Sequence, residues 1–123
     1  MTPEQLRERT KRFAVEIVRL FRVLPKNEEA RVMGRQVLRA GTSVAANYRA
    51  VCRARSKAEF VAKMGVVVEE ADESVFWLEL MEETGVLRKD ATRRLLAEGK
   101  ELLAIFAASH RTAKFGRNDP MIQ

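Results

Sequence analysis

The sequence predicts an all-α protein that folds as an antiparallel up-down four-helix bundle. Apolar residues recur every three or four positions in four separate segments, which is typical of amphipathic helices joined by short connections. No segment alternates apolar and polar residues as a half-buried strand would, and the 123 residues include only three prolines and six glycines. A chain of this length is one domain. We assign residues 1–113 to the bundle and residues 114–123 to a flexible C-terminal tail.

The first helix is predicted from the N-terminus to the residues before Pro25. Thr2 can cap this helix, Pro3 suits its first turn, and Gln5 stands where a capping box needs its second partner. Pro25 ends the helix, because the residue before a proline is pushed out of helical geometry. The apolar face carries Leu6, Phe13, Ile17, Leu20, Phe21 and Leu24.

The second helix is predicted over residues 28–54, behind Asn27 as its cap. Its apolar side carries Val32, Met33, Val37, Val44, Tyr48 and Val51. Gly34 and Gly41 lie inside this helix, where each costs about 1 kcal/mol of helix propensity relative to alanine. The pattern favours a seam of small residues that lets another helix approach closely, and a break at Gly41 is the alternative.

The third helix has the clearest start in the chain. Ser56 and Glu59 have the spacing of a capping box and directly precede an apolar run. Gly85 is a typical residue just beyond a helix C-terminus. A fourth helix begins near Lys89 or Asp90, where the sequence leaves the capping residue open.

Charge is distributed unevenly along the chain. The formal net charge is +6, but residues 1–55 carry a net +8, residues 56–85 a net −6 and the remainder a net +4. The protein therefore has surfaces of opposite sign, which favours ordered pairing between helices or between subunits.

Arginines follow helical spacing on both of the first two helices. A phosphate-binding surface is one interpretation, because Arg contacts to phosphates dominate nucleic-acid affinity, and binding of this kind is largely independent of base sequence. The alternative is a solvated face, or arginines paired with the acidic third helix. The candidate nucleic-acid-binding residues are Arg9, Arg12, Arg19, Arg22, Arg35, Arg39, Arg49 and Arg53.

Catalytic and cofactor motifs are not found in the sequence. His110 is the only histidine and Cys52 the only cysteine, so neither a metal-binding cluster nor a disulfide framework is expected. A di-metal bundle needs two Glu-x-x-His pairs, which one histidine cannot supply. No apolar run approaches the roughly 20 residues of a membrane-spanning helix. We expect a cytoplasmic protein with no enzymatic activity, no cofactor and no membrane association.

One stretch of the second and third helices resembles a known family. The segment from Gln36 to Asn47, followed by Ser56 to Phe60, resembles the bacterial four-helix-bundle proteins first noticed as products of intervening sequences in large-subunit ribosomal RNA genes. The resemblance covers about residues 10–110. Where the family pattern continues with Glu-Gly after the Asn47 region, this chain has Ala50-Val51. The matching positions are Arg39, Ser43, Asn47, Ser56, Glu59 and Phe60, for which we expect structural roles.

The resemblance implies a homo-oligomer, since known members of the family form ring-like pentamers. It also implies a possible partner class: a relative of the same fold, the accessory variability protein of diversity-generating retroelements, is a basic pentameric barrel that binds reverse transcriptase and nucleic acid. We therefore expect a non-enzymatic pentamer that binds RNA or DNA non-specifically through the arginine-rich faces of its first two helices. The alternative is a protein–protein interaction scaffold or accessory subunit with no nucleic-acid binding.

Overall fold

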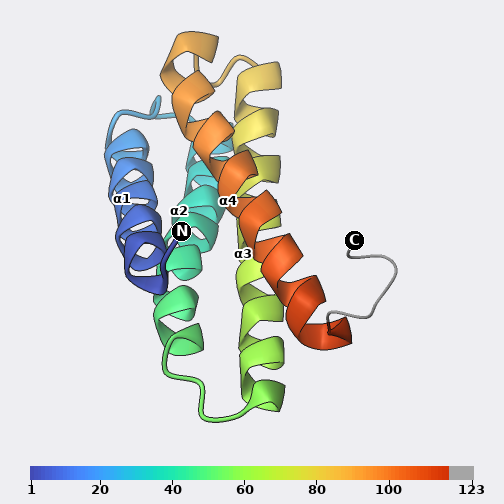
Figure 1. Ribbon diagram of the computed structural model, residues 1–123. Helices are drawn as coiled ribbons and strands as arrows, with labels where there is room; N and C mark the ends of the chain where they lie inside the picture. The colour runs from blue at the N-terminus through green and yellow to red at the C-terminus, as the bar shows by residue number, and fades with distance from the viewer. Residues whose placement is uncertain (117–123) are drawn as a thin grey trace.

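The computed structural model describes residues 1–116, which form four helices (Figure 1). In chain order they are α1 (Pro3–Arg22), α2 (Glu28–Val51), α3 (Lys57–Glu83) and α4 (Lys89–Phe115). Neighbouring helices run in opposite directions, and no strand occurs within the described residues. The predicted all-α up-down bundle is confirmed.

Three of the four helix starts are capped by the side chains that the sequence indicates. Thr2 and Gln5 form a reciprocal capping box at α1, and the Asn27 side chain accepts the Ala30 N–H at α2. The Ser56 hydroxyl accepts the Glu59 N–H at α3, with 3.0 Å between the two atoms. Arg88 precedes α4 without a side-chain cap, which is why no clear start of this helix could be predicted.

Two predicted helix ends differ from the structure. Helix α2 ends at Val51, three residues before the expected end, because the chain turns at Cys52 and Arg53. Helix α4 continues through Phe115, so Lys114 and Phe115 belong to it and not to the predicted tail. Gly116 follows with a φ of 80°, a conformation that glycine adopts readily. Residues 117–123 of the expected tail lie outside the described part of the chain.

Helices α1 and α2 pack closely through the two glycines of α2. A Cβ atom on Gly41 would lie 2.7 Å from the Ile17 Cγ1, which leaves no room for a methyl group. Phe21 and Leu24 lie against Gly34 in the same way. Helix α2 runs unbroken past both positions, so the close approach is confirmed and the alternative break at Gly41 is wrong.

The core lies between α2 and α3, with α1 packed against α2 and α4 packed against α3. Helix α2 packs along α3, α3 along α4, and α1 along α2. Of the helix pairs that are in contact, α1 and α4 have the smallest interface. The backbones of α1 and α3 make no close approach in residues 1–116, so these two helices lie diagonally across the bundle (Figure 1). The largest fully buried apolar side chains are Phe13, Ile17, Val37, Val44, Val67, Leu78, Met81, Leu102 and Phe106.

Candidate nucleic-acid interface

The outer face of α2 and the turn that follows it carry a stripe of unpaired arginines, called the α2 stripe below. Arg35, Arg49 and Arg53 are exposed and form no ion pair with any residue of 1–116. Arg35 and Arg49 are 14 residues apart within α2, which returns nearly to the same side of the helix about 21 Å further along its axis. Arg53 follows in the turn just beyond Val51. Arg31, one turn before Arg35, has the same spacing, but it forms an ion pair with Glu28 at 3.6 Å.

Arg39 lies on the edge of this stripe but is held by α3. Its guanidinium donates to Glu70 at 3.0 Å and to Glu73 at 2.5 Å, and its side chain is 48% exposed. The hydrogen bond that Arg39 donates to Glu73 is the main reason that the pKa of Arg39 is raised. Arg39 therefore links α2 to α3, and its charge is largely balanced within the chain.

Arg9 has the same role between α1 and α4. It donates to both carboxylate oxygens of Glu98, at 2.8 and 2.7 Å, and lies 2.8 Å from Glu101. Its side chain is only 15% exposed, and its hydrogen bonds to Glu98 and Glu101 raise its pKa. A second pair, Arg94 to Glu16 at 2.8 Å, bridges the same two helices. Arg9 is therefore a packing residue of the α1–α4 groove.

The remaining arginines of α1 point away from the bundle. Arg12, Arg19 and Arg22 are exposed and form no ion pair with other described residues. They follow a different line from Arg9, because the spacing 12, 15, 19 and 22 keeps to one outer face that also carries Val15. The four candidate arginines of α1 therefore do not form a single row. Arg9 lies in the α1–α4 groove, and the other three lie on the outer face of α1.

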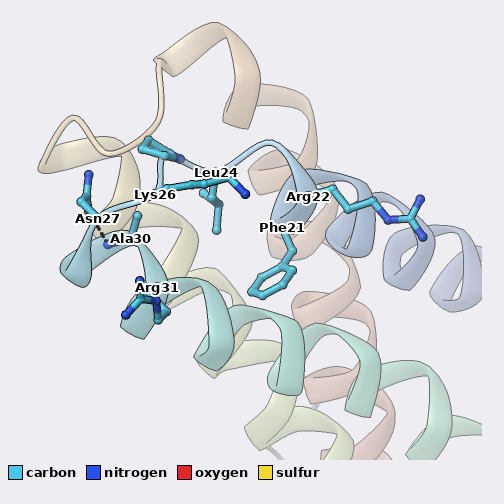
Figure 2. A pocket seen from close by; sticks show the side chains of 8 residues that line it. Phe21, Arg22, Leu24, Lys26, Asn27, Ala30 and Arg31 are labelled. Atoms are coloured by element: carbon cyan, nitrogen blue, oxygen red, sulfur yellow. Dashed lines mark hydrogen bonds between the residues drawn. The ribbon is translucent and has the colours of Figure 1, made fainter.

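A basic pocket closes one end of the α1–α2 pair (Figure 2). Its volume is about 370 Å³, and Phe21 and Leu24 supply apolar surface that rests on Gly34. Cations surround it: Arg22 on α1, Lys26 in the connection and Arg31 on α2. In Figure 2 the side chain of Arg22 extends away along α1, whereas Lys26 lies beside Leu24. Lys26 and Arg31, absent from the predicted set, add positive charge at this end of the α2 stripe.

Side chains at five of the six positions of the family pattern make contacts within the fold, and Ser43 contributes its backbone carbonyl. Asn47 donates from its side-chain amide to the Ser43 carbonyl, at 2.9 Å, within α2. Ser56 caps α3, Glu59 lies 3.5 Å from Lys63 one turn later, and Phe60 packs partly buried against the core. The hydrogen bonds and ion pairs of Asn47, Ser56 and Glu59 lie within one helix or its cap, whereas the Arg39 link joins α2 to α3.

Reactive side chains do not gather into a site. Residues 1–116 contain no cluster of three or more His, Cys, Asp or Glu side chains that could hold a metal ion. His110 lies against Gly65 where α4 crosses α3. Cys52 is partly buried next to Tyr48, and burial of Tyr48 raises its pKa to about 12. Of the helices described, none is both long and apolar enough to cross a membrane.

Comparison with known proteins agrees with this arrangement. The family model described as "23S rRNA-intervening sequence protein" matches residues 5–108. The chain belongs to this family. A crystal structure of a protein of unknown function from the S23 ribosomal protein family of Bacteroides thetaiotaomicron is similar, with a TM-score of 0.82 and 30% sequence identity. The match covers 91% of this chain and all of that one. Among curated proteins, none matches the chain.

Membership of the 23S rRNA-intervening sequence protein family is consistent with the features described above. The matched residues 5–108 include all of α2 and α3, and therefore the six pattern positions and the α2 arginine stripe. The resemblance inferred from the sequence is confirmed at the level of family and fold.

Proposed function

We propose that this member of the 23S rRNA-intervening sequence protein family is a cytoplasmic, non-enzymatic homo-oligomer that binds RNA or DNA through phosphate contacts. The observation that carries the proposal is the α2 stripe, in which Arg35, Arg49 and Arg53 are exposed and unpaired among the described residues. Exposed guanidinium groups without acidic partners are free to replace the counterions of a phosphate backbone. The family resemblance supports a pentamer and, as a partner class, a reverse transcriptase.

The stripe favours binding that does not depend on base sequence. Its arginines are exposed along the side of α2 and in the turn that follows it, and Arg35 and Arg49 are about 21 Å apart along the helix. Phosphates therefore provide the contacts, and affinity falls steeply with salt. The basic pocket beside Lys26 lies at the α2 N-terminal end of the same surface and lengthens the phosphate track.

A pair of double variants tests this assignment by fluorescence anisotropy with labelled random-sequence RNA over a salt series. Arg49→Gln with Arg53→Gln should reduce the slope of log affinity against log salt by about two units, since each lost phosphate contact removes close to one. The matched control, Arg93→Gln with Arg111→Gln, removes the same charge from exposed positions on α4 and should leave the slope almost unchanged. Equal slopes in the two double variants would refute binding through α2.

A protein-interaction scaffold is the second candidate function. The outer face of α3 favours it, because acidic residues and the exposed Phe76 occur there together. Capture of one defined protein by the purified chain, unaffected by nuclease, together with no RNA binding at low salt, would favour the scaffold.

A further inference from the structure

The outer face of α3 combines apolar and acidic side chains at the spacing of a helix-packing stripe. Val66, Glu69, Glu73, Phe76 and Leu80 follow one another at intervals of three and four residues, which places them on one side of the helix. Phe76 is 52% exposed and Val66 40% exposed, although both are large apolar residues. Phe76 is supported from behind by Trp77, whose ring centre lies 5.0 Å away at an angle of 75°.

The outer face of α1 is basic and so is opposite in charge to the acidic outer face of α3. Arg12, Val15, Arg19 and Arg22 have the same alternation of three- and four-residue intervals. Val15 is 40% exposed in the middle of this face, and the three arginines around it have no acidic partner in residues 1–116. Lys11 adds a further exposed cation beside them.

These two faces cannot meet within one chain. Helices α1 and α3 are diagonal in the bundle, with no close approach between their backbones, so their outer faces point in opposite directions. A symmetric contact of α3 with α3, or of α1 with α1, would bring like charges together. A contact of α1 in one copy with α3 in another brings cation to carboxylate and covers the exposed valines and Phe76.

We propose that the outer face of α1 in one copy packs on the outer face of α3 in a second copy, head to tail. The inference rests on the homo-oligomer in the proposed function and names the surfaces that build it. Contacts of this type use two different faces of each copy, so they close into a ring or extend into a filament. The α2 stripe takes no part in the contact, and Arg35, Arg49 and Arg53 remain available to phosphate after assembly.

Charge reversal and charge exchange test the contact by the mass of the full chain in solution, measured by light scattering. Arg12→Glu with Arg19→Glu reverses α1, and Glu69→Lys with Asp72→Lys reverses α3 at two exposed acids that have no ion pair among the described residues. Each reversed variant should fall from a multiple of the chain mass to 14.0 kDa. The chain that carries all four substitutions should assemble again, because positions 12 and 19 of α1 are then acidic and positions 69 and 72 of α3 are basic.

Two controls keep the outcome clear. Arg93→Glu with Arg111→Glu makes the same charge change as the α1 reversal, at exposed positions on α4, and should assemble like the wild type. Circular dichroism should show equal helix content in all variants, since every substituted side chain is exposed. A four-substitution chain that stays at 14.0 kDa, or single-face reversals that keep the wild-type mass, would overturn the contact.

The result also separates this inference from the proposed function. A wild-type chain that is monomeric overturns both the contact and the homo-oligomer. A wild-type assembly that survives both reversals overturns the contact alone. Nucleic-acid binding is judged independently by the Arg49 and Arg53 variants, because those residues lie outside the two faces.

Discussion

Replacing Gly41 by alanine should destabilise the protein, although alanine is the better helix former. The added methyl carbon would stand 2.7 Å from the Ile17 Cγ1, 3.1 Å from its Cγ2 and 3.2 Å from its Cβ. Unstrained carbon atoms stay about 3.5–4.0 Å apart. Ile17 is fully buried and branched at Cβ, so it cannot turn aside without displacing other core residues.

The size of the effect follows from two opposing contributions. Exchange of glycine for alanine inside a helix contributes about 1 kcal/mol of stability. Overpacking of a well-filled core costs about 1–3 kcal/mol, and this site belongs at the upper end because three atoms of one rigid side chain obstruct the methyl. We expect a net loss of about 1–2 kcal/mol in the free energy of unfolding.

Urea unfolding followed by circular dichroism, at one fixed chain concentration, measures this loss. Gly65→Ala is the matched control, because its methyl would meet only the partly exposed His110 ring, at 3.3 Å, which can shift. That variant should gain up to about 1 kcal/mol. If Gly41→Ala were stabilised as much as Gly65→Ala, the close packing of α1 on α2 through Gly41 would be refuted.

Three further predictions concern single side chains. Tyr48 has a pKa of about 12 in the folded chain against about 10 in the unfolded chain, so its contribution to the free energy of unfolding is complete below pH 10 and declines above pH 10. Stability should fall by about 2 kcal/mol by pH 12, and by less in Tyr48→Phe. Equal losses in the two chains would contradict the burial argument. In urea unfolding, Ser56→Ala should lower the free energy of unfolding by about 1 kcal/mol. Arg88→Ser supplies the missing cap of α4 and should raise it by about 0.5 kcal/mol. The reverse order would contradict the capping account. Arg9→Gln should lower the free energy of unfolding by about 1 kcal/mol at low salt and by less in 1 M salt, because screening weakens the ion pairs of Arg9 with Glu98 and Glu101. A loss of stability that is independent of salt would show that packing alone is involved.

Local signals made the fold predictable from the sequence. Thr2, Asn27 and Ser56 cap the helices they were expected to cap, because capping depends on residues only three positions apart. The end of α2 and the extent of α4 were less predictable. Near both ends the residues suit a helix, and the position at which the chain leaves it depends on contacts with the rest of the fold.

The candidate interface was only partly predictable, for a different reason. Helical spacing predicts Arg35, Arg49 and Arg53 on one face; all three are exposed, although Arg53 lies in the turn beyond α2. The spacing cannot show that Arg9 and Arg39 are held by carboxylates that are 89 and 31 residues away in the chain, because those pairs exist only after the helices pack. Arg31 has the same spacing, but it is paired with Glu28 one turn earlier in α2.

The central claim is that the α2 stripe binds phosphates, and the salt dependence of wild-type affinity for random-sequence RNA tests it most directly. Three contacts, from Arg35, Arg49 and Arg53, give a slope of about −2 to −3 and a loss of affinity of about 20- to 40-fold between 50 and 200 mM salt. The account predicts this loss with little change between RNA sequences. The absence of binding at 50 mM salt, or an affinity that does not change with salt, would contradict it.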